Sequence, residues 1–151
     1  EFNSYISKAR RNFGPEVTRR MIIGVFVPSA GHAGKYFLKA MKVKSKLTKE
    51  INEAFKKFDL LIAPTVPVLP FKIGEKTSNA TEMYLSDIYT TPVNLAGLPA
   101  LSIPVGYSDN IPVGMQIIGN DFTEDKILEI AHLFQKETDW HLQVPEAFSH
   151  E

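Results

Sequence analysis

The chain has 151 residues, enough for one domain with a hydrophobic core, and its 17 basic side chains balance 17 acidic ones. A content of 44% hydrophobic and 23% charged residues is typical of a globular protein, and the neutral balance argues against a protein whose main role is binding nucleic acid. Cysteine is absent, which excludes disulfides, thiolate metal sites and a cysteine nucleophile.

The first part of the chain predicts two helices. Gly14-Pro15-Glu16 is typical of a helix start, because proline suits the first helical position and an acidic side chain suits the positive end of the helix dipole. Residues 21–27 are apolar on every side of that helix, which predicts burial. A longer helix is expected over 36–58, where spacings of four, four and three place these apolar residues on one face: Leu47, Ile51, Phe55 and Phe58.

A strand, an irregular segment and a third helix are predicted next. Residues 59–64 form a short apolar run ended by proline, which is typical of a buried strand. The proline-rich stretch 64–79 is the longest irregular segment, and loops of this length are usually functional or disordered. A helix is expected over 81–89, with Pro92 interrupting it.

The last part predicts a hairpin and a final helix. Residues 101–105 and 113–118 are expected to form two strands joined by a turn at 108–110, with Pro104 tolerable at a sheet edge or bulge. Thr123 is expected to cap the final helix. The apolar stripe of that helix comprises Ile127, Ile130, Ala131 and Phe134.

No self-contained active site is recognisable. The sequence has no glycine-rich phosphate loop, no G-x-S-x-G elbow, and no serine followed three positions later by lysine. The histidines lack the spacing of a metal site and lie at 32, 132, 141 and 150. Ser29 and His32 allow the hypothesis of a nucleophile and base, but without an orienting acid or an oxyanion loop a polar helix terminus is the favoured interpretation.

Eight lysines between 35 and 57 decorate the long helix. Such a face can release counterions from phosphates, but no aromatic stacking positions interleave with the lysines. A solvated helix face is therefore the favoured interpretation, with a nucleic-acid contact as the alternative. No apolar run approaches the ~20 residues of a membrane span and no signal peptide is recognisable, so we expect a cytoplasmic protein.

Two charged residues are candidate ligand contacts. Arg20 lies where the first helix becomes apolar, so its guanidinium is expected to be partly desolvated, and its planar fork suits a carboxylate. Asp87 follows Met83 and Tyr84 on the side of its helix expected to face the interior, where a carboxylate needs a cation or hydrogen-bond donors. From the pattern alone, a structural ion pair or helix-edge charges are the favoured interpretation, and a ligand site is the alternative.

Several motifs together resemble one known family. TPVNLAGLPALSIPVG, followed by IPVGMQIIG, is similar to the C-terminal part of the amidase signature family. FGPEVTRRMIIG, FDLLIAPTVP, MYLSDIYTTPVNLAGLPA and ETDWH resemble one branch of it, the A subunits of glutamyl-tRNA(Gln)/aspartyl-tRNA(Asn) amidotransferases. The resemblance runs from about Phe13 to His141. It implies the C-terminal portion of the amidase signature fold, an α/β fold with a mixed sheet and flanking helices, and it makes 1–151 a single partial domain.

The resemblance also implies an activity. In the family branch, L-glutamine is hydrolysed and the ammonia serves a partner subunit that converts Glu-tRNA(Gln) or Asp-tRNA(Asn) to its amide. The implied protein partners are the B and C subunits of the amidotransferase, with tRNA bound indirectly through the B subunit. ATP and Mg²⁺ are implied for the partner subunit's step, and no cofactor or metal is expected in this chain.

The family's catalytic serines and lysine lie in an N-terminal half, around a Gly/Ser-rich signature that this sequence lacks. We therefore expect no catalytic residue here, an inactive chain when alone, and a start at Glu1 that reflects truncation of a longer protein. If its strands pair with strands of the absent half, the isolated chain exposes open sheet edges and apolar surface.

Two substrate-binding residues carry over from the family by position. Arg20, the second arginine of TRR, matches the residue that holds the substrate carboxylate, and Asp87, in MYLSDIYT, matches the residue that takes the substrate ammonium group. The prolines and glycines of 92–106 are expected to shape a turning path behind the pocket, with Asn94 making a structural hydrogen bond. Two alternatives stay open: another amidase-family hydrolase, or a non-catalytic module of the same fold that binds a partner protein.

Overall fold

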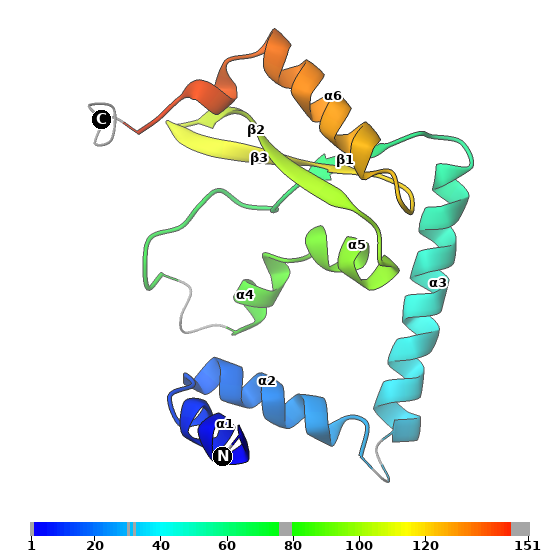
Figure 1. Ribbon diagram of the computed structural model, residues 1–151, viewed down its shortest axis with the longest axis vertical. Coiled ribbons are helices and arrows are strands. Elements are labelled where there is room, and N and C mark those ends of the chain that lie inside the picture. Colours follow the sequence, from blue (N-terminus) through cyan, green and yellow to red (C-terminus); the bar gives the residue numbers. More distant parts are fainter. Residues whose placement is uncertain (1, 30, 32, 76–79, 146–151) are drawn as a thin grey trace. The chain divides into compact units, whose positions relative to one another are not determined.

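The computed structural model describes residues 2–29, 31, 33–75 and 80–145. Contacts within the chain divide it into two compact units, Glu1–Lys46 and Leu47–Glu151, and each is described by itself. Figure 1 labels the helices and strands of both units. The division counts only contacts between residues of this chain, whereas the predicted domain includes further residues outside it. The prediction that 1–151 is part of a single domain therefore stays a prediction.

The N-terminal unit is helical. It contains α1 (Phe2–Arg10), α2 (Pro15–Phe26), a π-helical segment (Ala33–Phe37) and the first part of α3 (Leu38–Phe55). Gly14 is the N-cap of α2 in an extended conformation and Pro15 is the first helical residue, which confirms the predicted helix start. The α-helix predicted over 36–58 is shorter at both ends, because the π-helical segment precedes it and Phe55 ends it.

The apolar end of α2 is not buried, which corrects the burial predicted for residues 21–27. No residue of α2 is buried, and Ile22 and Val25 are 64% and 74% exposed. Phe26 has an aromatic neighbour in this unit, Tyr36, with 6.5 Å between the ring centroids. A helix that is apolar on all sides needs packing partners on several of them. The described residues leave most of this surface facing solvent.

The C-terminal unit is built on a three-stranded sheet. Its strands are β1 (Leu61–Pro64), β2 (Ala100–Ser108) and β3 (Ile111–Ile118), in the spatial order β1-β3-β2. All three predicted strands are confirmed. Both pairings among the described residues are antiparallel, because β2 and β3 form a hairpin and β1 runs against β3. The mixed sheet implied by the family resemblance would therefore need a parallel strand contributed by residues outside the described ones.

The hairpin between β2 and β3 follows the chemistry of its turn residues. Asp109 and Asn110 have φ angles of 51° and 61°, the left-handed conformations that a two-residue turn of type I′ requires. Aspartate and asparagine adopt this conformation more readily than most residues. The strand register shifts between Pro104 and Gly106, and β2 lies at an edge of the described sheet, which confirms the predicted tolerance for proline there.

Three α-helices accompany the sheet: α4 (Ala80–Leu85), α5 (Thr90–Ala96) and α6 (Glu124–Glu137). The helix predicted over 81–89 ends at Leu85, and a turn separates it from α5. Pro92 does not interrupt a helix as predicted; it lies in the first turn of α5, where a backbone N–H has no helical partner. Thr123 precedes α6 as predicted, but its hydroxyl donates to Asn120 O at 2.8 Å instead of capping the helix.

Apolar side chains pack on both faces of the sheet. α6 covers one face and α5 lies on the other (Figure 1). The core on the α6 face contains Ile103, Ile117, Ile127 and Ala131. The core on the α5 face contains Val93, Leu98 and Ile118, with Ile51 and Phe55 of α3 packed against them. Phe58, predicted to extend the α3 stripe, lies beyond the helix and is 57% exposed.

Candidate functional site

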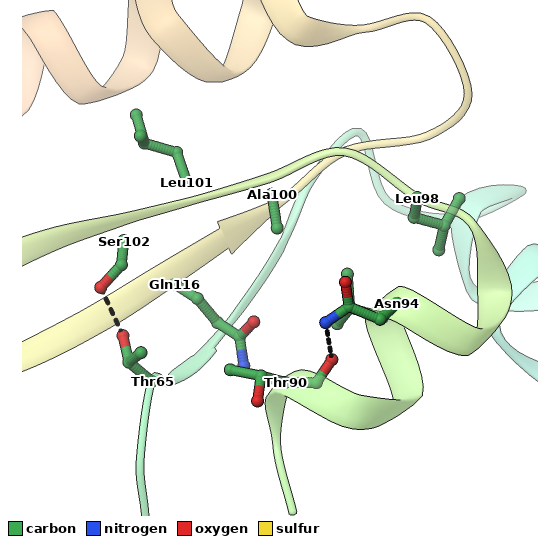
Figure 2. A pocket seen from close by; sticks show the side chains of 9 residues that line it. Thr65, Thr90, Asn94, Leu98, Ala100, Leu101, Ser102 and Gln116 are labelled. Carbon is green, nitrogen blue, oxygen red and sulfur yellow. Dashed lines mark hydrogen bonds between the residues drawn. The ribbon is translucent and has the colours of Figure 1, made fainter. Parts of the chain in front are cut away.

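One end of the α5 face of the sheet is polar. Ser102 pairs with Gln116 across β2 and β3, and Thr65 follows β1 directly. The hydroxyls Thr65 Oγ1 and Ser102 Oγ are 2.7 Å apart and share a hydrogen bond (Figure 2). Gly114 lies close to this pair, and a Cβ added there would be 3.0 Å from Thr65 Oγ1. Glycine therefore allows the strand to approach the hydroxyl pair.

A cavity of about 280 Å³ lies between this polar end of the sheet and α5 (Figure 2). Its polar groups are hydroxyls and carboxamides, contributed by Thr65, Thr90, Asn94, Ser102 and Gln116. None of the residues that line it is charged. Because burying an unpaired charge is costly, the cavity suits a neutral polar group better than an ion.

Gln116 is the one buried polar or charged side chain among the described residues, with 3% of its surface exposed. Its Nε2 donates two hydrogen bonds, to Pro64 O at 3.2 Å and to Tyr89 O at 3.0 Å. These bonds link central strand β3 to the end of β1 and to the turn before α5. We did not identify Gln116 from the sequence. The available signal was a glutamine inside an otherwise apolar strand, which requires buried hydrogen-bond partners.

Asp87 lies in the turn between α4 and α5, which corrects its predicted place on the inward side of a helix. The residue is exposed. Its carbonyl oxygen accepts hydrogen bonds from Thr91 N at 2.9 Å and from Thr90 Oγ1 at 3.4 Å. In the described part of the chain, no side chain pairs with its carboxylate. The carboxylate is therefore accessible to a cationic group.

Arg20 lies in α2 of the N-terminal unit, and its side chain is 59% exposed, which corrects the partial desolvation predicted for it. Its Nε donates to Glu16 Oε1 at 2.8 Å, while Arg19 Nη2 contacts Glu16 Oε2 at 2.6 Å. An exposed ion pair of this kind contributes only about 0–1 kcal/mol to stability. Arg20 and Asp87 belong to different units. Their joint site stays a prediction.

Asn94 makes the structural hydrogen bond predicted for it, from Nδ2 to Thr90 O at 2.9 Å, one turn back in α5 (Figure 2). Ser29 Oγ donates to Phe26 O at 2.6 Å, which agrees with a polar helix terminus, and His32 lies outside the described residues. Where the chain is described, no group of three or more metal-binding side chains occurs and no helix is both long and apolar enough to cross a membrane.

Comparison with known proteins identifies the family. A family model described as Amidase matches residues 2–128, most of the chain. The chain belongs to the amidase family. This amidase chain is also similar in structure to the A subunit of glutamyl-tRNA(Gln) amidotransferase from Thermotoga maritima, with a TM-score of 0.68 and 47% identity over 87% of this chain and 29% of that one. The crystal structure of an amidase that is 21% identical, with a TM-score of 0.70 over 89% of this chain and 31% of that one, shares the fold.

Curated relatives point to the same branch of the amidase family. The A subunit of glutamyl-tRNA(Gln) amidotransferase from Dehalococcoides mccartyi is 52% identical over 135 residues, 89% of this chain and 28% of the relative. The protein of the same name from Cenarchaeum symbiosum is 49% identical over 147 residues, 97% of this chain and 30% of the relative. The amidase chain therefore spans about 30% of the length of these relatives.

Proposed function

We propose that this chain is the C-terminal, substrate-recognising part of the glutamine-hydrolysing A subunit of a glutamyl-tRNA(Gln)/aspartyl-tRNA(Asn) amidotransferase. The observation that carries the proposal is 52% identity over 135 residues to a protein named as the A subunit of glutamyl-tRNA(Gln) amidotransferase. A second relative of that name aligns over 97% of the chain, so the aligned region spans positions 20 and 87.

In this proposal, the whole subunit hydrolyses the side-chain amide of L-glutamine and releases ammonia. The ammonia amidates Glu-tRNA(Gln) or Asp-tRNA(Asn) on a partner subunit. The B and C subunits of the amidotransferase are the protein partners, tRNA is contacted through the B subunit, and ATP with Mg²⁺ serves the partner's step. The complex acts in the cytoplasm. The nucleophile lies outside this chain, so the chain alone does not hydrolyse glutamine.

Arg20 and Asp87 recognise the two charged ends of the substrate. The guanidinium of Arg20 binds the α-carboxylate, because its planar fork donates two parallel hydrogen bonds. The exposed pair with Glu16 is weak, so a substrate carboxylate displaces it at little cost. The carboxylate of Asp87 binds the α-ammonium group, and no described residue competes for it. Holding both ends orients the side-chain amide for attack.

The experiment compares two amides in a completed protein, in which this chain is joined to the preceding part of the Thermotoga maritima relative. One substrate is L-glutamine, and the other is glutaramate, which has the same carboxylate and carboxamide but no ammonium group. Arg20→Ala is expected to lower kcat/KM for both substrates. Asp87→Ala is expected to lower it about ten- to hundredfold for L-glutamine and little for glutaramate, because only L-glutamine loses a charge-assisted hydrogen bond.

Lys126→Ala serves as the control, since it removes an exposed charge from α6, which covers the opposite face of the sheet from α5. The proposal is wrong if Asp87→Ala affects the two amides equally, or if the completed protein prefers an amide without an amino-acid group. The second outcome favours another amidase-family hydrolase.

A further inference from the structure

The side chain of Gln116 joins three segments that are far apart in the sequence. It projects from central strand β3 toward α5 (Figure 2). Its Nε2 donates to Pro64 O at the end of β1 and to Tyr89 O in the turn before α5. The carboxamide nitrogen carries two N–H donors, so it serves both carbonyls without placing a charge at this buried position. Both hydrogen bonds are part-buried, and breaking them would leave the buried amide of Gln116 without a partner, which is unfavourable.

The turn that Gln116 holds is the turn that carries Asp87. Tyr89 lies two residues after Asp87, and Asp87 O accepts the backbone N–H of Thr91 at 2.9 Å. Asp87 is therefore connected by backbone hydrogen bonding to the first turn of α5. Toward α4, the turn is closed by the bonds Ser86 N to Met83 O, Asp87 N to Tyr84 O and Ile88 N to Leu85 O, each 3.2 Å long.

Two anchors tie this turn and α5 to the sheet. Val93, which is 6% exposed, packs with Leu98 and Ile118 and fixes the middle of α5. Gln116 fixes the turn itself through Tyr89 O. The hydrophobic anchor determines how α5 lies on the sheet, and the hydrogen-bond anchor determines where its N-terminal turn lies. The side chain of Asp87 is not held by any described partner, so its position depends on this backbone.

We propose that Gln116 is a positioning residue that holds Asp87 where its carboxylate meets the ammonium group of an α-amino-acid substrate. The inference rests on the proposed function for the role of Asp87, and on the hydrogen bonds of Gln116 for the rest. Gln116 touches no substrate itself. It sets the selectivity for amides that carry an α-ammonium group over amides that lack one.

The first test measures selectivity in the completed protein defined above. Gln116→Met keeps the volume of the side chain and removes both donors. It is expected to lower kcat/KM for L-glutamine about tenfold while leaving glutaramate within a few-fold, because displacement of a binding group by about 1 Å costs up to 10²-fold. In the background of Asp87→Ala, the same substitution is expected to change the selectivity no further. An equal loss for both amides would show a merely structural role and overturn the inference.

The second test measures amide hydrogen exchange in the 151-residue chain and needs no activity. Gln116→Met is expected to speed exchange of the Thr91 amide, which bonds to Asp87 O. The exchange rate of the Gly97 amide, at the other end of α5, is expected to increase less. Thr138→Val is the matched control: it removes a part-buried hydrogen bond to Phe134 O at 2.9 Å in α6 and should leave Thr91 unchanged. Gln116→Asn, which is too short to reach both carbonyls, is the second variant should Gln116→Met not fold.

The outcomes separate the two claims. Unchanged exchange at Thr91 in the Gln116 variants overturns the positioning role, whatever the activity. In the other case, exchange at Thr91 is faster but Asp87→Ala does not change the selectivity for L-glutamine over glutaramate. This result overturns the proposed function instead. Faster exchange combined with selective loss of L-glutamine hydrolysis supports both.

Discussion

The two units differ in how much of their apolar surface they bury. In the C-terminal unit, a three-stranded sheet packs α6 on one face and α5 with the end of α3 on the other. Every residue classed as buried in the described chain lies between 93 and 131. In the N-terminal unit, α2 has the more uniformly apolar segment and no buried residue. Apolar composition therefore does not produce a core where packing partners are missing.

The largest expected effect comes from separating the units. Residues 47–151 retain both cores and the part of α3 that carries Ile51 and Phe55, so they are expected to unfold cooperatively. Residues 1–46 alone are expected to show only fractional helicity, because short helices without tertiary packing are marginal in water. Circular dichroism with thermal unfolding measures both. A cooperative transition in 1–46 would contradict the comparison.

Matched truncations of isoleucine in the two units are expected to differ strongly. Ile117 is 1% exposed, and Ile117→Ala should lower the free energy of unfolding by about 2–5 kcal/mol. Ile22 is 64% exposed, and Ile22→Ala should change it by less than about 0.5 kcal/mol. Urea denaturation of the 151-residue chain gives both values. Similar values for the two variants would mean that α2 is packed as tightly as the sheet.

Substitutions at two glycines test the same difference in packing between the two units. A Cβ at Gly119 would lie 2.8 Å from Ile127 Cδ1, so Gly119→Ala is expected to destabilise the chain by about 1–3 kcal/mol through overpacking. A Cβ at Gly24 in α2 meets nothing within 4 Å, so Gly24→Ala is expected to stabilise the helix by about 0.5–1 kcal/mol. Melting temperatures of the two variants should move in opposite directions. A loss of stability in Gly24→Ala would show that this side of α2 is covered.

A small, salt-dependent effect is expected at the ion pair of α2. Glu16 contacts both Arg19 and Arg20, and the side chains are 45–59% exposed. Glu16→Gln should therefore lower the free energy of unfolding by less than about 1 kcal/mol, and less at high salt. Urea denaturation at low and high salt measures the change. A larger effect that persists at high salt would mean that this surface is buried in solution.

The hairpin and the helix starts were predictable because their signals are local. Asp109 and Asn110 favour left-handed conformations wherever they occur in a turn, and Pro15 suits a first helical turn in any fold. The burial of residues 21–27 was predicted wrongly. An apolar pattern shows that a helix needs packing partners, but it does not show that the chain supplies them. The sequence did not predict the sheet register. In the structure, Ile117 and Ile118 serve opposite cores because successive strand residues point to opposite faces.

The candidate site was less accessible to sequence reasoning. Asp87 was assigned to the inward face of a helix because the helix was predicted to continue to 89, whereas α4 ends at Leu85 and leaves Asp87 in an exposed turn. Gln116 gave a clear signal of a buried polar group, but its partners come from residues 64 and 89, and no local rule predicts such distant pairs. The role of Arg20 came from family resemblance and stays a prediction.

The most direct test of the central claim is ammonia release from L-glutamine, measured for the chain alone and for the completed protein. The account predicts no release from the chain alone, release from the completed protein, and release with a kcat/KM about ten- to hundredfold lower in Asp87→Ala. Hydrolysis of L-glutamine by the 151-residue chain alone would contradict it, because a nucleophile would then lie within this chain.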